Sequence, residues 1–119
     1  MKKPVRVVLI GDAKESFKRL NEIVGYQVSS GKTNTKEIQL LKSIKTKIEF
    51  IKQNPFYGDS IKKEQIPKNL NVPNLWRIEL SDYWRMLYTI RGDEIEVVCF
   101  VLEIINHEKY DKFFGYRRK

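Results

Sequence analysis

The sequence predicts an α+β fold with an N-terminal strand, an antiparallel helical hairpin on one face of a mostly antiparallel four-stranded sheet, and a short C-terminal helix. Three observations predict it. A short β-branched run, VRVVLI, comes first, two stretches with apolar residues at helical spacing follow it, and three runs of strand character come last. Because the two helices are consecutive in the chain, we expect them to pack on each other and on the same face of the sheet.

The first strand is expected at residues 5–10, where it ends at a Gly-Asp pair. Asp12 is a suitable N-cap for the helix that follows, and Glu15 lies three residues later, as a capping box requires. Apolar residues at helical spacing continue to about Val28, and the Ser-Ser-Gly sequence that comes next ends the helix.

The second helix begins at Asn34 or Thr35, and its apolar stripe predicts one buried face. The stripe consists of Ile38, Leu41, Ile44, Ile48 and Ile51. The helix ends at Asn54, because a residue before proline avoids the helical region of backbone space. Residues 55–74 contain three prolines and a glycine, so we expect a connecting loop there.

Three strands should follow, at residues 75–81, 83–91 and 94–105. Tight turns are expected at Ser81-Asp82 and at Gly92-Asp93. The last strand is apolar at both parities from residue 97 to residue 102, which is typical of a strand in the middle of a sheet. A short helix should begin at Asn106 and end at Gly115.

Strand alternation assigns side chains to the two faces of the sheet. The apolar set is expected to pack on the helices and comprises Trp76, Ile78, Leu80, Trp84, Met86, Tyr88 and Ile90. Arg77, Glu79 and Arg85 then point to the opposite face, which we expect to be partly open. Two arginines would therefore project from a rigid platform into a groove.

Size and charge bound the possible functions. The chain has 119 residues, the length of one ordinary domain, and we treat residues 1–119 as a single domain. Its net charge of +8 and pI near 9.6 favour an anionic partner, nucleic acid first and an acidic protein second. Lysines on the solvated helix faces account for part of this excess.

The setting that the sequence favours is the cytoplasm. Cys99 is the single cysteine and lies in an apolar run, so we expect a buried thiol in a reducing compartment. The N-terminal apolar run is only six residues long, too short for a signal peptide or a membrane span.

Catalytic chemistry is suggested only by a group of Arg, Glu, His, Lys and Tyr residues on the strands and the C-terminal segment. The sequence contains no glycine-rich phosphate loop and no metal-ligand spacing, so we expect neither a cofactor nor a metal. Guanidinium groups stabilise the negative charge of a phosphoryl transition state. A histidine or a carboxylate can move the proton of a 2′-hydroxyl group, so the residue types suit cleavage of RNA.

Four segments resemble the RelE/ParE superfamily of toxins from type II toxin–antitoxin systems. They are NPFYGDSIKK, WRIELSDYWRMLYTI, IEVVCFVLEI and INHEKYDKFFGYRR. The resemblance covers most of the chain, and the expected order of elements matches that of the family. RelE-type members cut messenger RNA in the ribosomal decoding site, whereas ParE-type members share the fold and inhibit DNA gyrase. The resemblance therefore implies a toxin with a cognate antitoxin.

The resemblance also implies roles for individual residues. The family's phosphate-contacting arginine lies in an aromatic-Arg-aliphatic-aliphatic-Tyr strand and falls on Arg85. The basic residue of the preceding strand falls on Arg77, and the basic or histidine position after the last strand falls on His107. Glu79 stands where some nuclease members have a lysine; Glu79 and His107 together match the Glu/His combination of others. The general base is left open between these two.

The C-terminal segment supplies the remaining candidates. The family's C-terminal aromatic residue falls on Tyr110, and Phe113 and Tyr116 are alternatives for its place. Lys109, Arg117 and Arg118 are candidates for RNA binding. The resemblance implies messenger RNA on the ribosome as substrate, and both a homodimer and a heterotetramer with the antitoxin are compatible with it.

Each residue also has a structural interpretation. Arg85 could form a cross-strand ion pair with Glu79, His107 could serve the start of a helix, and Tyr110 could be a core residue. Two other functions therefore stand beside the nuclease. One is a gyrase inhibitor with a non-catalytic face, and the other is a decayed toxin that acts only through protein binding.

Overall fold

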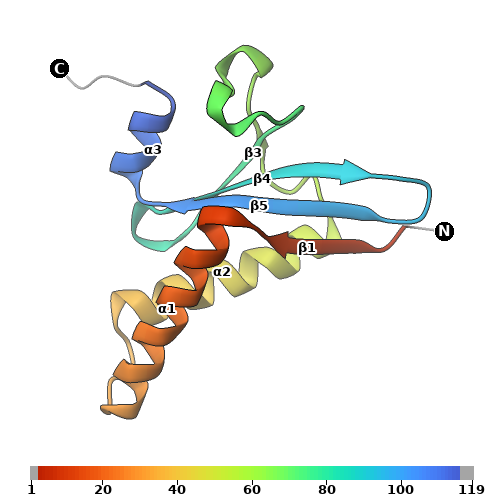
Figure 1. Ribbon diagram of the computed structural model, residues 1–119. Coiled ribbons are helices and arrows are strands. Elements are labelled where there is room, and N and C mark those ends of the chain that lie inside the picture. The colour runs from red at the N-terminus through yellow and green to blue at the C-terminus, as the bar shows by residue number, and fades with distance from the viewer. Residues whose placement is uncertain (1–2, 116–119) are drawn as a thin grey trace.

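The computed structural model describes residues 3–115, which form a five-stranded sheet with two long helices on one face and a short helix on the other (Figure 1). The helices are α1 (Gly11–Ser29), α2 (Lys36–Gln53) and α3 (His107–Phe113). The strands are β1 (Val5–Leu9), β2 (Asp59–Ser60), β3 (Trp76–Glu79), β4 (Arg85–Gly92) and β5 (Val97–Ile105). The predicted α+β class and element order are confirmed.

The sheet has the strand order β1-β5-β4-β3-β2, with one strand more than the sequence predicts. β1 pairs with β5 in parallel, and every other pair is antiparallel. The extra strand is β2, whose two residues pair with Arg77 and Trp76. β5 has a neighbour on both sides, so the prediction that the last strand lies inside the sheet is confirmed.

The start of α1 differs from the prediction that Asp12 caps it. The helix begins at Gly11, and the N-cap is Ile10, which makes no side-chain capping bond. Gly11 has φ of +53°, a conformation that glycine adopts without strain, and it makes the turn out of β1. Asp12 therefore already lies in the first turn, where its charge faces the positive end of the helix dipole. In α2 the expected cap is present, because Thr35 accepts a hydrogen bond from the Ile38 amide at 3.1 Å.

The main core lies between the sheet and the hairpin of α1 and α2, as strand alternation predicts. Ile78, Met86 and Tyr88 from the sheet pack in one cluster with Leu20 and Ile44 from the helices. Cys99 belongs to the same cluster and is a buried free thiol. Within residues 3–115, no helix combines the length and apolarity that a membrane crossing requires.

The opposite face is partly covered, in agreement with the expectation of a partly open face. A second cluster of buried residues lies there and comprises Leu75, Leu87, Ile105 and Tyr110. Side chains from α3 and from the segment 61–72 pack against it, including Ile61, Ile66, Leu70, Val72 and Phe113. The predicted loop thus carries apolar residues of its own, and burying them covers part of this face of the sheet.

Tyr88 fixes the segment that leads into β2. Its buried hydroxyl donates to the Pro55 carbonyl oxygen at 2.7 Å and accepts from the Gly58 amide at 3.0 Å. Burial raises the pKa of Tyr88 to about 12, so the hydroxyl keeps its proton. Gly58 lies so close to β3 that a Cβ atom would stand 2.8 Å from the Arg77 carbonyl oxygen and 3.0 Å from Ile78 Cγ1. The segment around Gly58 therefore packs directly against the backbone of Arg77.

Gly58→Ala should therefore destabilise the protein, because the new methyl group meets backbone on a strand that cannot move freely. We expect a loss of about 2 kcal/mol or more in the free energy of unfolding, measured by urea denaturation. The matched control is Gly25→Ala in α1, where a Cβ atom meets nothing within 4 Å. That change should stabilise the protein by up to about 1 kcal/mol, since alanine is the better helix former. Equal effects of the two substitutions would contradict the close approach.

Candidate functional site

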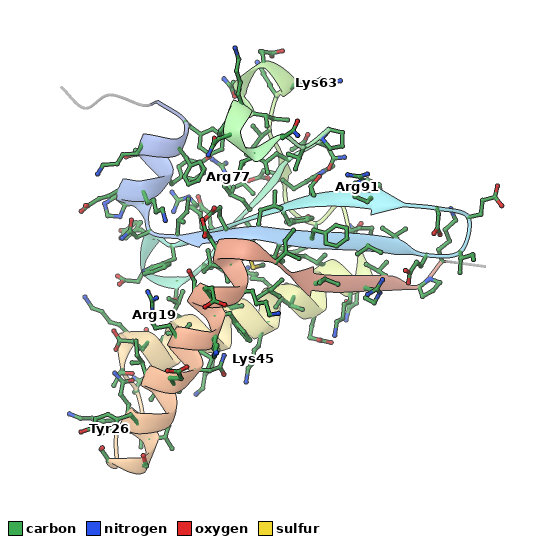
Figure 2. The ribbon with its side chains drawn as sticks, viewed as in Figure 1. Arg19, Tyr26, Lys45, Lys63, Arg77 and Arg91 are labelled. Atoms are coloured by element: carbon green, nitrogen blue, oxygen red, sulfur yellow. The ribbon has the colours of Figure 1, made fainter. Side chains whose placement is uncertain are left out.

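Two arginines lie side by side on the sheet face that α3 partly covers. In the β3–β4 register Arg77 is opposite Leu87, and Arg85 is opposite Glu79 and, on β5, opposite Ile105. Leu87 and Ile105 both belong to the second cluster, so the predicted orientation of the arginines, away from the hairpin, is confirmed. Figure 2 shows Arg77 on the α3 side of the sheet.

Tyr110 of α3 contacts both arginines. Its hydroxyl accepts a hydrogen bond from Arg77 Nη1 at 3.1 Å. The centroid of its ring lies 5.9 Å from Arg77 Cζ and 5.4 Å from Arg85 Cζ, within the range of cation–π attraction. The hydrogen bond to Tyr110 raises the pKa of Arg77 above its already high value, so this guanidinium stays charged. Tyr110 is also 4% exposed, which makes it a core residue as well as a site residue.

Each arginine is paired with a carboxylate that is far more exposed than the arginine itself. Asp59 lies 3.3 Å from Arg77, and Glu79 lies 3.8 Å from Arg85. The side chains of Asp59 and Glu79 are 74% and 68% exposed, whereas that of Arg85 is 18% exposed. Ion pairs with such solvated partners are worth at most about 1 kcal/mol, so a phosphate group could replace the carboxylates.

The two guanidinium groups keep donor capacity. Among the described residues, the Nε atoms of Arg77 and Arg85 are buried and have no hydrogen-bond partner. A buried donor without a partner costs free energy that a correctly placed acceptor recovers. Phosphate oxygens are acceptors of the geometry that guanidinium groups bind best. The pair is therefore suited to an anion with several oxygens.

The turn between β3 and β4 is wider than the tight turn predicted. It forms a short 3-10 helix, Ser81–Tyr83, in which Asp82 and Tyr83 have φ of +55° and +62°. The left-handed conformation costs roughly 1 to 2 kcal/mol per residue for side chains other than glycine. Arg85 Nη1 donates to the Tyr83 carbonyl oxygen at 2.9 Å, which ties this turn to the arginine pair.

His107 lies at the edge of the site and is the first residue of α3. Its ring makes an edge-on contact with Tyr83, with 6.0 Å between ring centroids. The capping role belongs to Asn106, whose side chain accepts from the Lys109 amide at 2.9 Å. His107 is therefore linked to the arginine pair through the 81–83 turn.

The remaining predicted residues are not gathered with the arginine pair. Lys109 lines a groove of about 340 Å³ between the helical hairpin and the start of α3. Phe113 packs against the second cluster, so Tyr110 is the aromatic residue that meets the arginines. Tyr116, Arg117 and Arg118 lie outside the described residues.

Two residues beside this site were not predicted from the sequence. Asp59 was missed because a two-residue strand carries no alternation pattern. Glu103 was missed although an acidic residue in the apolar run FVLEII is a visible signal. The β4–β5 register passes from the pair Leu87–Glu103 to Tyr88–Val101, so one residue of β5 bulges out and Glu103 turns toward the α3 face. Burial, and then the nearby charge of Asp12, raises the pKa of Glu103 to about 7.

Comparison with solved structures finds a protein of similar architecture. The structure described as "YoeB/ParE toxin from Agrobacterium tumefaciens" matches over 86% of this chain and 98% of that chain, with a TM-score of 0.58. The chain has the RelE-like fold. The sequence identity in this match is 13%, so the likeness is one of architecture. Comparisons of the sequence with protein-family models and with curated proteins give no match.

Within the described part of this RelE-like fold, no three His, Cys, Asp or Glu residues lie close enough together to hold a metal ion. The chemistry that the site itself offers is positive charge at fixed positions, from Arg77 and Arg85. Around it stand the phenol of Tyr110, the imidazole of His107 and the carboxylates of Asp59 and Glu79.

Glu103→Gln should change how stability depends on pH. The folded protein holds the Glu103 proton more tightly than the unfolded chain, whose glutamate titrates near its ordinary pKa of 4.5. The contribution of Glu103 to the free energy of unfolding is therefore fully present below about pH 4.5 and is lost as the pH rises through about 7. As the pH rises from 5 to 8, the wild type should lose about 2 kcal/mol more of its free energy of unfolding than E103Q does, as measured by urea denaturation. Parallel pH profiles for the two proteins would contradict a buried, protonated Glu103.

Proposed function

We propose that this protein is a RelE-like toxin that cuts messenger RNA on the ribosome and so inhibits translation. The observation that carries the proposal is the convergence of Arg77 and Arg85 on the buried Tyr110 within a RelE-like fold. Two half-buried guanidinium groups on a sheet make a rigid anion site, and the net charge of +8 attracts RNA to it.

Cleavage proceeds by attack of a 2′-hydroxyl oxygen on the adjacent phosphorus, with departure of the 5′-oxygen. Arg77 and Arg85 hold the two non-bridging phosphate oxygens, which gather negative charge as the phosphorus becomes five-coordinate. Electrostatic stabilisation is largest when the donors need not move, and these donors are held by Tyr110 and by the Tyr83 carbonyl oxygen. The nucleophile belongs to the substrate, so the protein supplies charge and proton transfer.

The proton of the 2′-hydroxyl passes to His107 or to Glu79, and the departing 5′-oxygen takes up a proton from the protonated form of that residue or from water. Glu79 forms an ion pair with Arg85, and a phosphate that takes this place would free its carboxylate. The ring of His107 contacts the ring of Tyr83, whose carbonyl oxygen accepts a hydrogen bond from Arg85. Cleavage rates of His107→Ala and Glu79→Gln across pH would show which substitution removes the acidic limb of the profile, where the rate falls because the general base is protonated.

A cognate antitoxin is the proposed protein partner. The groove that contains Lys109 has an apolar floor, formed by Phe17, Leu20, Ile23, Leu40, Ile44, Trp84 and Ile104. Arg19, Lys36 and Lys109 lie along it with two carboxylates, Glu37 and Asp82, so the lining keeps an excess of positive charge. An acidic amphipathic segment is complementary to such a groove. The groove runs between the hairpin and the end of the sheet, where we expect such a segment to bind.

The ParE-type alternative is supported by one feature of the site. Asp59 and Glu79 already pair with the two arginines, so the free protein presents a site whose charge is partly neutralised. A partly neutralised site is sufficient for a non-catalytic toxin that binds a protein target such as gyrase. It is also sufficient for a decayed toxin that binds only its antitoxin.

Arg85→Ala tests the nuclease directly. In a translating extract, with message ends mapped by primer extension, this variant should cut about a hundredfold more slowly once bound, a loss of roughly 3 kcal/mol of transition-state stabilisation. The matched control is Arg91→Ala, which changes an exposed arginine of the same strand and should leave the rate unaltered. Alanine at Arg117 and Arg118 should instead weaken association and reduce its salt dependence. If Arg85→Ala cuts at the wild-type rate, the arginine pair is structural and the ParE-type alternative takes precedence.

Co-expression tests the partner. The product of the adjacent open reading frame should copurify with this protein as a tight complex. Ile23→Glu should weaken that complex, because Ile23 lines the groove and is 40% exposed, so the change leaves the core intact. Val28→Glu is the control, since Val28 lies on the same helix, is 57% exposed and does not line the groove. Harmless expression of the chain alone, without any copurifying product, would favour a decayed toxin.

A further inference from the structure

Tyr83 occupies a backbone position that suits glycine. It has φ of +62° and follows Asp82, which has φ of +55°. Aspartate tolerates the left-handed conformation comparatively well, but a bulky aromatic residue there is an outlier. Such strain persists where the surrounding structure enforces it, and it is concentrated at functional sites.

The fold gains little from the aromatic ring. Tyr83 is 72% exposed, so its ring buries little apolar surface. The contact that ties the turn to Arg85 uses the Tyr83 carbonyl oxygen, which any residue would provide. A glycine at this position would keep that hydrogen bond and relieve the strain. The side chain is thus unfavourable for stability in a place where it makes few internal contacts.

The ring stands beside the groups that would meet a phosphate. Its backbone is bonded to the Arg85 guanidinium at 2.9 Å, and its edge-on neighbour is His107, at 6.0 Å between centroids. The edge-on contact leaves most of the ring in solvent next to two candidate catalytic residues. An exposed aromatic ring beside fixed cations is the arrangement by which proteins bind single-stranded nucleic acid, with the cations on phosphates and the ring on a base.

We propose that Tyr83 is a stacking platform for an unpaired nucleobase next to the phosphate held by Arg85. This inference rests on the proposed function and adds to it a binding residue outside the predicted site. Stacking positions the strand, because a base fixed on Tyr83 sets the distance of its phosphate from Arg85. All four bases present a flat face, so Tyr83 contributes affinity and register with little dependence on sequence.

The test uses Tyr83→Gly, which should raise stability and lower the affinity for RNA. The melting temperature should rise, because glycine removes the strain. The affinity for a short, single-stranded 2′-O-methyl RNA, measured by fluorescence anisotropy, should fall about tenfold. This RNA lacks a free 2′-hydroxyl, so binding is measured apart from cleavage. Tyr83→Phe keeps the ring and should bind like the wild type.

Two controls separate stacking from other losses. On the same 2′-O-methyl backbone without bases, wild type and Tyr83→Gly should bind equally, because no base remains to stack. Tyr26→Ala removes another strongly exposed tyrosine, at 75% exposure on α1, and should leave RNA binding unchanged.

The outcomes distinguish this inference from the proposed function. If wild type and Tyr83→Gly bind RNA equally while the wild type cuts message, the nuclease stands and the stacking role is wrong. A protein that binds RNA through Tyr83 without cutting it would keep the stacking role and overturn the nuclease. If Tyr83→Gly binds RNA normally but loses the antitoxin, the ring is a protein contact and the inference fails. A wild type that binds no RNA overturns both.

Discussion

The contact between Tyr110 and the two strand arginines is the constraint on which the architecture of the site depends. The ring is 4% exposed and packs on Phe114 with 4.5 Å between centroids, while its hydroxyl accepts from Arg77. It joins α3 to the sheet and at the same time limits where Arg77 and Arg85 can point. The core of this face and the candidate site are therefore the same set of contacts, and a change that loosens α3 would also release the guanidinium groups.

Arginines that lie inside strands, rather than in the turn, carry their charge at fixed positions. A strand offers a backbone that hydrogen bonds on both sides hold in place, so the donors are oriented before a ligand arrives. Partial burial also strengthens their attraction for an anion, because fewer water dipoles screen it. The exposed carboxylates of Asp59 and Glu79 balance the charge of the free protein, and a bound phosphate would displace them into solvent.

Much of this arrangement was predictable from alternation alone, since the parity of β3 and β4 assigns Arg77 and Arg85 to one face and their apolar neighbours to the other. Other features depend on long-range packing that leaves no local pattern. The segment 61–72 has no regular period, yet its apolar side chains cover the second cluster. The bulge that turns Glu103 toward α3 is a property of the β4–β5 pairing. The positive φ of Tyr83 was hidden because a glycine, the usual signal for that conformation, is not there.

In the proposed mechanism, fixed guanidinium groups promote attack by the substrate's own 2′-hydroxyl. The chemical ends of the cut message distinguish this mechanism from others. Mass spectrometry of the upstream fragment should find a 2′,3′-cyclic phosphate or its opened product, and a single 2′-deoxynucleotide before the cut should abolish cleavage. An upstream fragment that ends in a 3′-hydroxyl, or a deoxy-substituted message that is still cut, would contradict the account.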